Sequence, residues 1–395
     1  IKYAREGIVL NAWQAYFNKL LSPMLALSPE AKRIYAPDGE FLREGDILFN
    51  RDMADTFEHL SIEGLDRFYD GFVAEAIMEG FGAKGLFTDG DLLDYKVRRR
   101  EPLELDYRGR SIFTNPPPSS GGSLISFALK LLEPYDLKAM GHNSTAYLEL
   151  MAKVMRITNE FRRAEFDHVV HDDGVIDKLL GEAGIEQYRK KLAKDFDGKV
   201  HGGAGGGEKG GALGNTTQIS VVDVDGNAAS ITTSIGIGCG VMIPGTGVMM
   251  NNMLGEEDLN PGGFHSLDPG IRMSSMMAPT IVMKGDTPEI VLGSGGSKRI
   301  RSAILQVILN ILDHSMEVSE AVNAPRVHFD DGTLQIEKGV HEDVTGELAT
   351  RLPKINKWKE RNLYFGGVHS VVDLDGELSG GGDNRRGGVS LVSVE

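Results

Sequence analysis

The hydrophobic pattern of this 395-residue chain changes its period at one glycine-rich segment, and that change limits the folds open to it. Before about residue 200, apolar side chains recur at helical spacing over the ranges 53–60, 65–79, 123–132, 145–161 and 175–192. After Thr216 the period becomes two, and Asp225-Gly226-Asn227 predicts a hairpin turn between strands at 217–222 and 228–234. Similar hairpins are expected at 279–292 and 369–378, with helices only at 298–312 and 341–352. The sequence therefore predicts a mainly helical segment 1–215 and a β-rich segment 216–395, folded together with sheets between helical layers.

The glycine-rich segment itself favours an exposed loop. Eight glycines lie between Gly202 and Gly214, out of 50 in the chain, and such a stretch has few side chains to pack. An isolated segment of this kind is most simply an interdomain linker. This one ends in Asn215-Thr216-Thr217 at the start of a predicted strand, which suggests a chemical role as well.

Thr216 combines a hydroxyl on a regular strand with a deformable peptide bond before it. Its hydroxyl could attack the carbonyl of Asn215, form an ester, and become a free N-terminal threonine after hydrolysis. The new α-amino group, with an ordinary pKa of about 7.7 to 8.0, could then accept the hydroxyl proton near neutral pH. The sequence therefore predicts self-cleavage between Asn215 and Thr216, followed by attack on amide bonds.

Acyl transfer also needs hydrogen-bond donors for a tetrahedral oxyanion. The glycine-rich turn at 293–297 precedes the predicted helix at Lys298, and we assign Gly295 and Gly296 as these donors. A phosphate-binding loop or a plain strand-to-helix turn are the alternatives, although the turn lacks the Gly-Lys-Ser/Thr ending of a P-loop. Ser274 and Ser275 could present hydroxyls to a substrate carboxylate, or could simply bond their own backbone.

Composition excludes several classes of function. A formal net charge of −15 disfavours nucleic-acid binding, and no apolar run approaches the length of a membrane span. The first residues lack the layout of a secretion signal, and Cys239 is the only cysteine, so the cytoplasm is the expected location. None of the ten histidines has metal-ligand spacing, so neither a metal nor a cofactor is expected. A small-molecule or peptide partner is the interpretation that remains.

Several motifs together resemble the γ-glutamyltransferase family, also called γ-glutamyltranspeptidases, of the N-terminal nucleophile hydrolase superfamily. They follow the family's order: Tyr107-Arg108-Gly109, the run 116–122, Asn215-Thr216-Thr217, the run 220–227, Asn251-Asn252, the run 273–281, the run 293–296, Ala324-Pro325-Arg326 and the run 383–387. The resemblance implies an α+β fold, a four-layer αββα sandwich, in which the two fragments of the cleaved chain stay associated.

The resemblance also implies roles for five residues of the catalytic centre. Thr216 would be the nucleophile, and Thr217 and Ser234 would position it. Gly295 and Gly296 would stabilise the oxyanion.

Substrate binding follows from the same resemblance. Ser274, Ser275 and Glu256 would hold the α-carboxylate and α-amino ends of the acyl group, with Asn252 also in the site. The implied substrate is a γ-glutamyl compound such as glutathione, and a homo-oligomer is possible.

Some positions depart from the family pattern. Gly236 stands where the family often has asparagine, and Met253-Leu254-Gly255-Glu256-Glu257 replaces the usual amide and paired aspartates. Residue 1 matches a point inside the family's large subunit, so its opening segment is not matched. Two alternatives stay open: a related acylase of the cephalosporin or glutaryl type, and an uncleaved, inactive relative that binds a γ-glutamyl compound.

Overall fold

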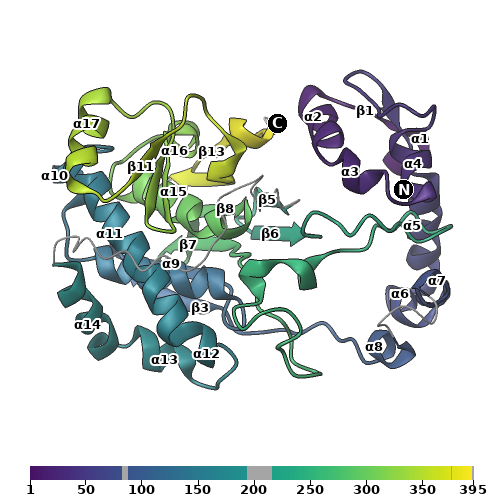
Figure 1. The fold of residues 1–395 in the computed structure, drawn as a ribbon, viewed down its shortest axis with the longest axis horizontal. Helices are drawn as coiled ribbons and strands as arrows, with labels where there is room; N and C mark the ends of the chain where they lie inside the picture. Colours follow the sequence, from purple (N-terminus) through teal and green to yellow (C-terminus); the bar gives the residue numbers. More distant parts are fainter. Residues whose placement is uncertain (82–87, 194–215, 375, 394–395) are drawn as a thin grey trace. The chain divides into compact units, whose positions relative to one another are not determined.

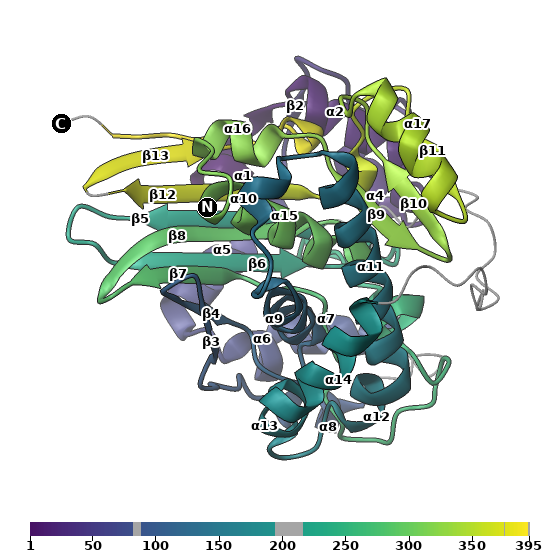
Figure 2. The same cartoon turned by 90° about the vertical axis from the view of Figure 1, so that its left-hand side faces the viewer.

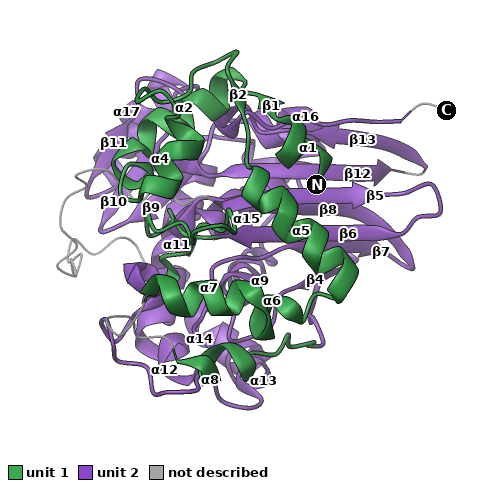
Figure 3. Cartoon of the chain, turned by 90° about the vertical axis from the view of Figure 1, so that its right-hand side faces the viewer, with its two compact units in different colours: residues 1–100, 235–253 green, residues 101–234, 254–395 purple. Residues whose placement is uncertain are grey.

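The chain divides into two compact units. The computed structural model describes residues 1–81, 88–193, 216–374 and 376–393. Unit 1 comprises residues 1–100 and 235–253, and unit 2 comprises residues 101–234 and 254–395 (Figure 3). Each unit contains residues from before and after position 216, so the units do not coincide with the predicted segments 1–215 and 216–395. The boundary at 215/216 remains a prediction of where the chain is cleaved.

Unit 1 is helical. Its helices are α1 (Lys2–Glu6), α2 (Ala12–Leu20), α3 (Ser22–Leu25), α4 (Pro29–Tyr35), α5 (Arg51–Glu63), α6 (Arg67–Asp70), α7 (Phe72–Phe81) and α8 (Asp89–Leu93), and β1 (Ile8–Val9) pairs with β2 (Ile47–Leu48). Side chains from the later segment complete its core, because Ile243 packs among Val73 and Ile77, and Met242 against Ile34. Residues 235–253 therefore belong to this unit by packing.

Unit 2 is built on a six-stranded antiparallel sheet. The spatial order is β13-β12-β8-β7-β4-β3. Its strands are β3 (Leu103–Tyr107), β4 (Arg110–Thr114), β7 (Thr280–Lys284), β8 (Thr287–Gly295), β12 (Gly367–Leu374) and β13 (Glu377–Gly381). A smaller sheet holds β9 (Val327–Asp330), β10 (Thr333–Ile336) and β11 (Ile355–Lys357).

Helices cover one face of the six-stranded sheet. They are α9 (Ser120–Leu132), α10 (Leu137–Met140), α11 (Thr145–Phe161), α12 (Asp167–Val169), α13 (Val175–Leu180), α14 (Glu182–Leu192), α15 (Ile300–Leu312), α16 (Val318–Asn323) and α17 (Glu342–Arg351). Helix α15 is buried from Ile300 to Ile311, and it lies between β8 and α9 (Figures 1 and 2). Phe127 of α9 stacks on Phe161 of α11 with ring centroids 4.0 Å apart, which joins the next helix to this layer.

A two-stranded sheet packs on the other face. It consists of β5 (Thr216–Val222) and β6 (Ala228–Ser234), and β5 lies against β8 and β12. Unit 2 thus contains a helical layer, a sheet and a second sheet in succession, visible in Figure 1 as α15, β8 and β5. This arrangement agrees with the predicted α+β class and supplies three of the four layers of an αββα sandwich.

The structure corrects part of the sequence interpretation. The first half is not only helical, because β3 and β4 supply two strands of the large sheet. The predicted helices at 65–79 and 175–192 are each broken, at Gly71 and Gly181, where a side chain would stand 2.7 Å from the carbonyl oxygen of the residue four positions earlier. Helix α16 and strands β9 to β11 were also not predicted; they are all six residues or shorter, and such lengths carry little periodic signal.

Candidate active site

Thr216 is the first residue of β5 and lies directly opposite Ser234 on β6. Its Oγ1 donates a hydrogen bond to Ser234 Oγ at 3.0 Å, and both residues are partly buried. The hairpin turn fixes this register, because Asp223 Oδ1 accepts hydrogen bonds from the backbone N–H groups of Asp225 and Asn227. The short turn predicted from the sequence therefore places the two hydroxyls face to face.

Strand β8 approaches β5 closely, and two of its residues at this point are glycines. A side-chain Cβ at Gly295 would stand 2.3 Å from the carbonyl oxygen of Thr216 and 3.3 Å from its Cβ. A Cβ at Gly293 would stand 2.1 Å from Gln218 Oε1. The distance at Gly295 is too short for any side chain, so this glycine sets the spacing between the two sheets at Thr216. At Gly293 the close neighbour is the side chain of Gln218.

Gln218 is a site residue that the sequence did not single out. It is 5% exposed and its Nε2 donates to Ser220 Oγ and Ser230 Oγ, each at 2.9 Å. These hydroxyls in turn donate to the carbonyl oxygens of His369 on β12 and Leu292 on β8. The inward side chains of the hairpin thus tie β5 and β6 to the six-stranded sheet. In the sequence, the alternation of polar residues along 216–222 was the only signal of Gln218.

The turn after β8 has an unusual backbone conformation. The strand ends at Gly295, and the next two residues have positive φ, 135° at Gly296 and 49° at Ser297. Ser297 begins the short 3₁₀ helix η5 (Ser297–Arg299), which leads into α15. A left-handed conformation at a non-glycine residue is uncommon and tends to occur at functional sites, so Ser297 joins the candidate residues.

Thr217 lies on the opposite face of β5 from Thr216. Successive side chains of a strand point to opposite faces, and the Thr217 side chain is exposed while Gln218 is buried. Its hydroxyl therefore does not share the face on which Thr216 meets Ser234. Any positioning role for Thr217 is limited to its backbone in the β5–β6 ladder.

Ser274 and Ser275 lie in the segment that leads into β7. The carbonyl oxygen of Ser275 accepts hydrogen bonds from the Ser120 N–H at 2.8 Å and the Ser119 hydroxyl at 3.1 Å, at the start of α9. Ser275 Oγ accepts a hydrogen bond from the Met277 N–H at 3.1 Å, so this hydroxyl bonds its own backbone, the simpler of the two sequence interpretations. Its proton is still available to donate. Ser274 is partly buried.

Glu256 lies within electrostatic reach of the turn. Burial and the neighbouring Asp258 raise the pKa of the Glu256 carboxyl, and Arg299 of η5 partly offsets the shift. Arg299 comes three residues after Gly296, so the Glu256 carboxyl and the predicted oxyanion turn share a charged neighbour. Its raised pKa shows a partly desolvated carboxyl, which suits a charged partner.

For two predicted positions, a role in this site stays a prediction. Asn252 belongs to unit 1, where its Oδ1 accepts a hydrogen bond from the Ile237 N–H at 2.8 Å. Asn215 and the glycine-rich segment 202–214 lie outside the described residues.

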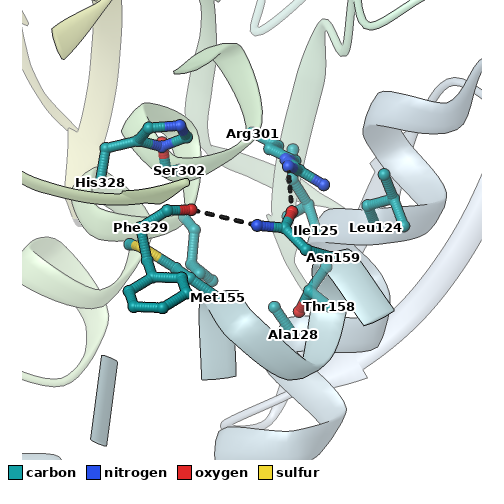
Figure 4. Close-up of a pocket in the computed structure, with 11 residues that line it drawn as sticks. Leu124, Ile125, Ala128, Met155, Thr158, Asn159, Arg301, Ser302, His328 and Phe329 are labelled. Atoms are coloured by element: carbon teal, nitrogen blue, oxygen red, sulfur yellow. Dashed lines mark hydrogen bonds between the residues drawn. The ribbon is translucent and has the colours of Figure 1, made fainter. Parts of the chain in front are cut away.

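A separate cavity lies among α9, α11, α15 and β9 of unit 2 (Figure 4). Arg301 donates to Asn159 Oδ1 at its edge, and Asn159 Nδ2 donates to the carbonyl oxygen of Phe329 at 3.1 Å. Its volume is about 20 Å³, roughly the room for one water-sized molecule. It is too small for an aminoacyl substrate and Thr216 does not line it.

Two further observations bear on cofactors and location. Within residues 1–81, 88–193, 216–374 and 376–393, no group of three or more His, Cys, Asp or Glu side chains is placed to hold a metal ion. In the same described part of the chain, every helix is too short or too polar to cross a membrane.

Comparison with known proteins gives consistent matches along the whole chain. The sequence model of the family described as gamma-glutamyltranspeptidase matches residues 1–393. An Acylase ACY 1 proenzyme of Pseudomonas sp. (strain V22) is 32% identical over 99% of this chain and 70% of its own length. A glutathione hydrolase proenzyme of Escherichia coli (strain K12) is 32% identical over 97% of this chain and 68% of its own length.

The fold has a close structural counterpart. A crystal structure of cephalosporin acylase from Bacillus halodurans superposes with a TM-score of 0.83, at 23% identity over 97% of this chain and 71% of that one. The chain thus spans about two thirds of the length of these relatives.

Proposed function

This chain belongs to the gamma-glutamyltranspeptidase family, and we propose that it is a proenzyme that cleaves itself before Thr216 to become an amide hydrolase or acyltransferase. The observation that carries the proposal is the 3.0 Å hydrogen bond between the Thr216 and Ser234 hydroxyls, at the first residue of a strand that Gly295 approaches closely. A nucleophile held in this way has a fixed direction of attack.

In the first step, Thr216 Oγ1 attacks the carbonyl carbon of Asn215. The new C–O bond forms as the C–N bond breaks, and the Thr216 nitrogen takes a proton to become an amine. Water then hydrolyses the ester, which leaves a carboxylate on Asn215 and restores the Thr216 hydroxyl. The free amine then serves as the general base in each catalytic cycle.

In the catalytic cycle, Thr216 Oγ1 attacks the substrate amide and the leaving amine takes up the proton that the α-amino group received. Gly295 and Gly296 supply the oxyanion donors, and Gly296 is better placed because the β-ladder ends one residue before it. Water or an amine acceptor then releases the acyl group. Thr217 contributes through the backbone pairing of β5 with β6.

For the acyl group we propose a γ-glutamyl unit, as in glutathione. The Ser274 and Ser275 hydroxyls would bind its α-carboxylate, and Glu256 would bind its α-amino group. The support for Glu256 is its partial burial beside Arg299, because a desolvated carboxylate binds an ammonium group more strongly than an exposed one does.

A related acylase with a different acyl group is a second candidate. The Acylase ACY 1 proenzyme and the glutathione hydrolase proenzyme are equally identical to this chain, at 32%.

Denaturing electrophoresis with N-terminal sequencing tests self-cleavage. The wild-type protein should give fragments 1–215 and 216–395, and Thr216→Ala should give one uncleaved band. A wild-type chain that stays intact after prolonged incubation would reject both enzymatic candidates in favour of an inactive binding protein.

Paired anilide substrates separate the two acyl groups. A γ-glutamyl anilide carries the α-amino group that a glutaryl anilide lacks, so the first should react faster in the wild type and the advantage should disappear in Glu256→Gln. The pKa of the Glu256 carboxyl is raised, and protonation removes its charge. KM for the γ-glutamyl anilide should therefore increase as the pH falls through the pKa of Glu256, and KM for the glutaryl anilide should not. Equal rates on both substrates would favour the acylase.

A further inference from the structure

Four charged side chains are buried together behind the Gly296 turn. Arg326, Asp383, Arg385 and Glu337 are each no more than 2% exposed, and we call them the buried ion cluster. Arg385 donates from Nε to Glu337 Oε1 at 2.8 Å and from Nη1 to Asp383 Oδ1 at 3.1 Å. Arg326 Nη2 lies 2.8 Å from Asp383 Oδ2. The four groups form one connected network.

Stability alone does not account for such a network. Taking charges out of water is costly, and apolar replacements of buried ion pairs are often neutral or stabilising. The network also makes hydrogen bonds to backbone groups of a neighbouring segment, residues 362–368. It fixes three points of one segment: Glu337 Oε1 accepts from the Asn362 N–H, Arg326 Nη1 donates to the Phe365 carbonyl, and Asp383 Oδ2 accepts from the Val368 N–H at 2.9 Å.

The segment fixed in this way forms the wall of the oxyanion turn. It runs through η6 (Leu363–Phe365) into the first residues of β12. A Cβ at Gly296 would stand 2.8 Å from the Cα of Gly366, and the Gly367 N–H donates to Ser294 Oγ at 3.3 Å. On its other side, the same turn meets Thr216 through Gly295. A continuous series of close contacts therefore joins the cluster to the nucleophile.

We propose that the buried ion cluster is a positioning device that holds the Gly296 N–H at its distance from Thr216. The inference rests on the proposed function, in which that N–H stabilises the oxyanion both in self-cleavage and in catalysis. Arg326, Glu337, Asp383 and Arg385 are positioning residues: they act through residues 362–368. Their loss should therefore lower kcat and slow self-cleavage, and should leave KM nearly unchanged.

Asp383→Asn tests the proposal, because it keeps the side-chain volume and removes the charge between the two arginines. We expect kcat to fall by about 100-fold, the cost of misplacing a catalytic group by about 1 Å. Glu289→Gln is the matched control, since it breaks the ion pair of Arg110 with a glutamate that is 3% exposed in β8, away from the turn. It should lower the melting temperature comparably and keep kcat.

Crystal structures of the wild type, Asp383→Asn and Glu289→Gln give a second readout that does not depend on activity. The distance between Thr216 Oγ1 and the Gly296 nitrogen should change by about 0.5 Å or more only in Asp383→Asn. If that variant fails to fold, Glu337→Gln tests the same network through the contact with Asn362. A folded variant with an unmoved turn and wild-type kcat would overturn the proposal. An uncleaved, inactive wild type would reject the proposed function alone, and the structures would still decide whether the cluster holds the turn.

Discussion

At the scale of single residues, the candidate site depends on two hydroxyl groups and one glycine. The Thr216 and Ser234 hydroxyls are cross-strand partners 3.0 Å apart. The glycine is Gly295, because a Cβ atom at this position would overlap the backbone of Thr216. The hydroxyl pair fixes the orientation of the Thr216 side chain, and the glycine lets β8 come close to the backbone of Thr216.

Ser234→Ala should slow both self-cleavage and turnover. The Thr216 hydroxyl would lose its acceptor and rotate freely, so we expect a fall of about 10- to 100-fold in each rate without loss of the fold. Time courses of cleavage on gels and kcat of the mature protein measure this. Thr233→Ala is the control, because Thr233 is adjacent but exposed on the opposite face. Equal effects of the two substitutions would show that Ser234 has no specific role.

Gly295→Ala should abolish self-cleavage and destabilise the protein. The added methyl group cannot be accommodated 2.3 Å from the Thr216 carbonyl oxygen, so β5 or β8 must shift, at a cost of about 1–3 kcal/mol. Urea unfolding and gel analysis measure both effects. Gly346→Ala in α17 is the control, because nothing lies within 4 Å of its Cβ position, and it should stabilise the helix by up to about 1 kcal/mol. A cleaved, stable Gly295→Ala protein would contradict the close approach of the two strands.

At the scale of elements, ion pairs hold the short helices around the site. Arg162 of η2 (Arg162–Phe166) bonds Asp258 of η4 (Glu257–Leu259), with Arg162 Nη1 2.6 Å from Asp258 Oδ1. The same arginine bonds Asp167 through Nε at 3.1 Å. Since Glu256 immediately precedes η4, this pairing also fixes the backbone that carries the proposed amine-binding carboxylate.

Asp258→Asn should destabilise unit 2 in a pH-dependent way. Burial alone would raise the pKa of Asp258, but Arg162, Arg301 and Lys298 outweigh burial and lower it. A lowered folded-state pKa means that the carboxylate stabilises the fold above its unfolded pKa of about 3.9, and that this contribution is lost as the pH falls through the folded-state value. Removing one partner of a buried pair costs about 3–5 kcal/mol at neutral pH.

Urea unfolding at a series of pH values checks this expectation. The difference in free energy of unfolding between wild type and Asp258→Asn should be largest at neutral pH and should shrink in acid. Asp268→Asn, an exposed aspartate of the same loop, should show little difference at any pH. A difference that does not vary with pH would argue against an ionised Asp258.

At the scale of the whole molecule, the central sheet combines strands from both sides of the proposed cleavage site. Strands β3 and β4 precede residue 216, and β4 pairs with β7 in a ladder from Ser111↔Met283 to Thr114↔Thr280. The helical layer is shared in the same way, because α9 packs on α15. Cleavage before Thr216 would therefore cut the chain without dividing its core.

The two fragments should consequently stay together under native conditions. Cleaved wild type and uncleaved Thr216→Ala should elute at the same volume in gel filtration, and the fragments should separate only in denaturant. Separation in buffer alone would contradict a shared sheet and core.

The sequence indicated the nucleophile and its partner strands through local signals. The turn Asp225-Gly226-Asn227 and the period-two pattern around it determine β5 and β6, whose observed bounds differ from the prediction by at most one residue. The strand at 103–107 had a comparable signal, since Leu103, Leu105 and Tyr107 alternate with charged residues before an Arg108-Gly109 turn. Ser297 gave no such signal. Gln218 had only the polar alternation of its strand, and Arg326, Asp383 and Arg385 stood in motifs of the resemblance without an assigned role. Their contacts with β8, β12 and Glu337 join residues remote in sequence, so neighbouring residues could not reveal them.

The sequence by itself determined where the chain turns and which strand carries Thr216, because hairpin turns and strand alternation are set by neighbouring residues. Only the tertiary structure decided that Gly295 lies against Thr216, that Thr217 points away from Ser234, and that Glu256 lies near Arg299. The reason is physical. Sheet-to-sheet spacing and the burial of charges depend on long-range packing, to which each residue contributes only a small part of the free energy.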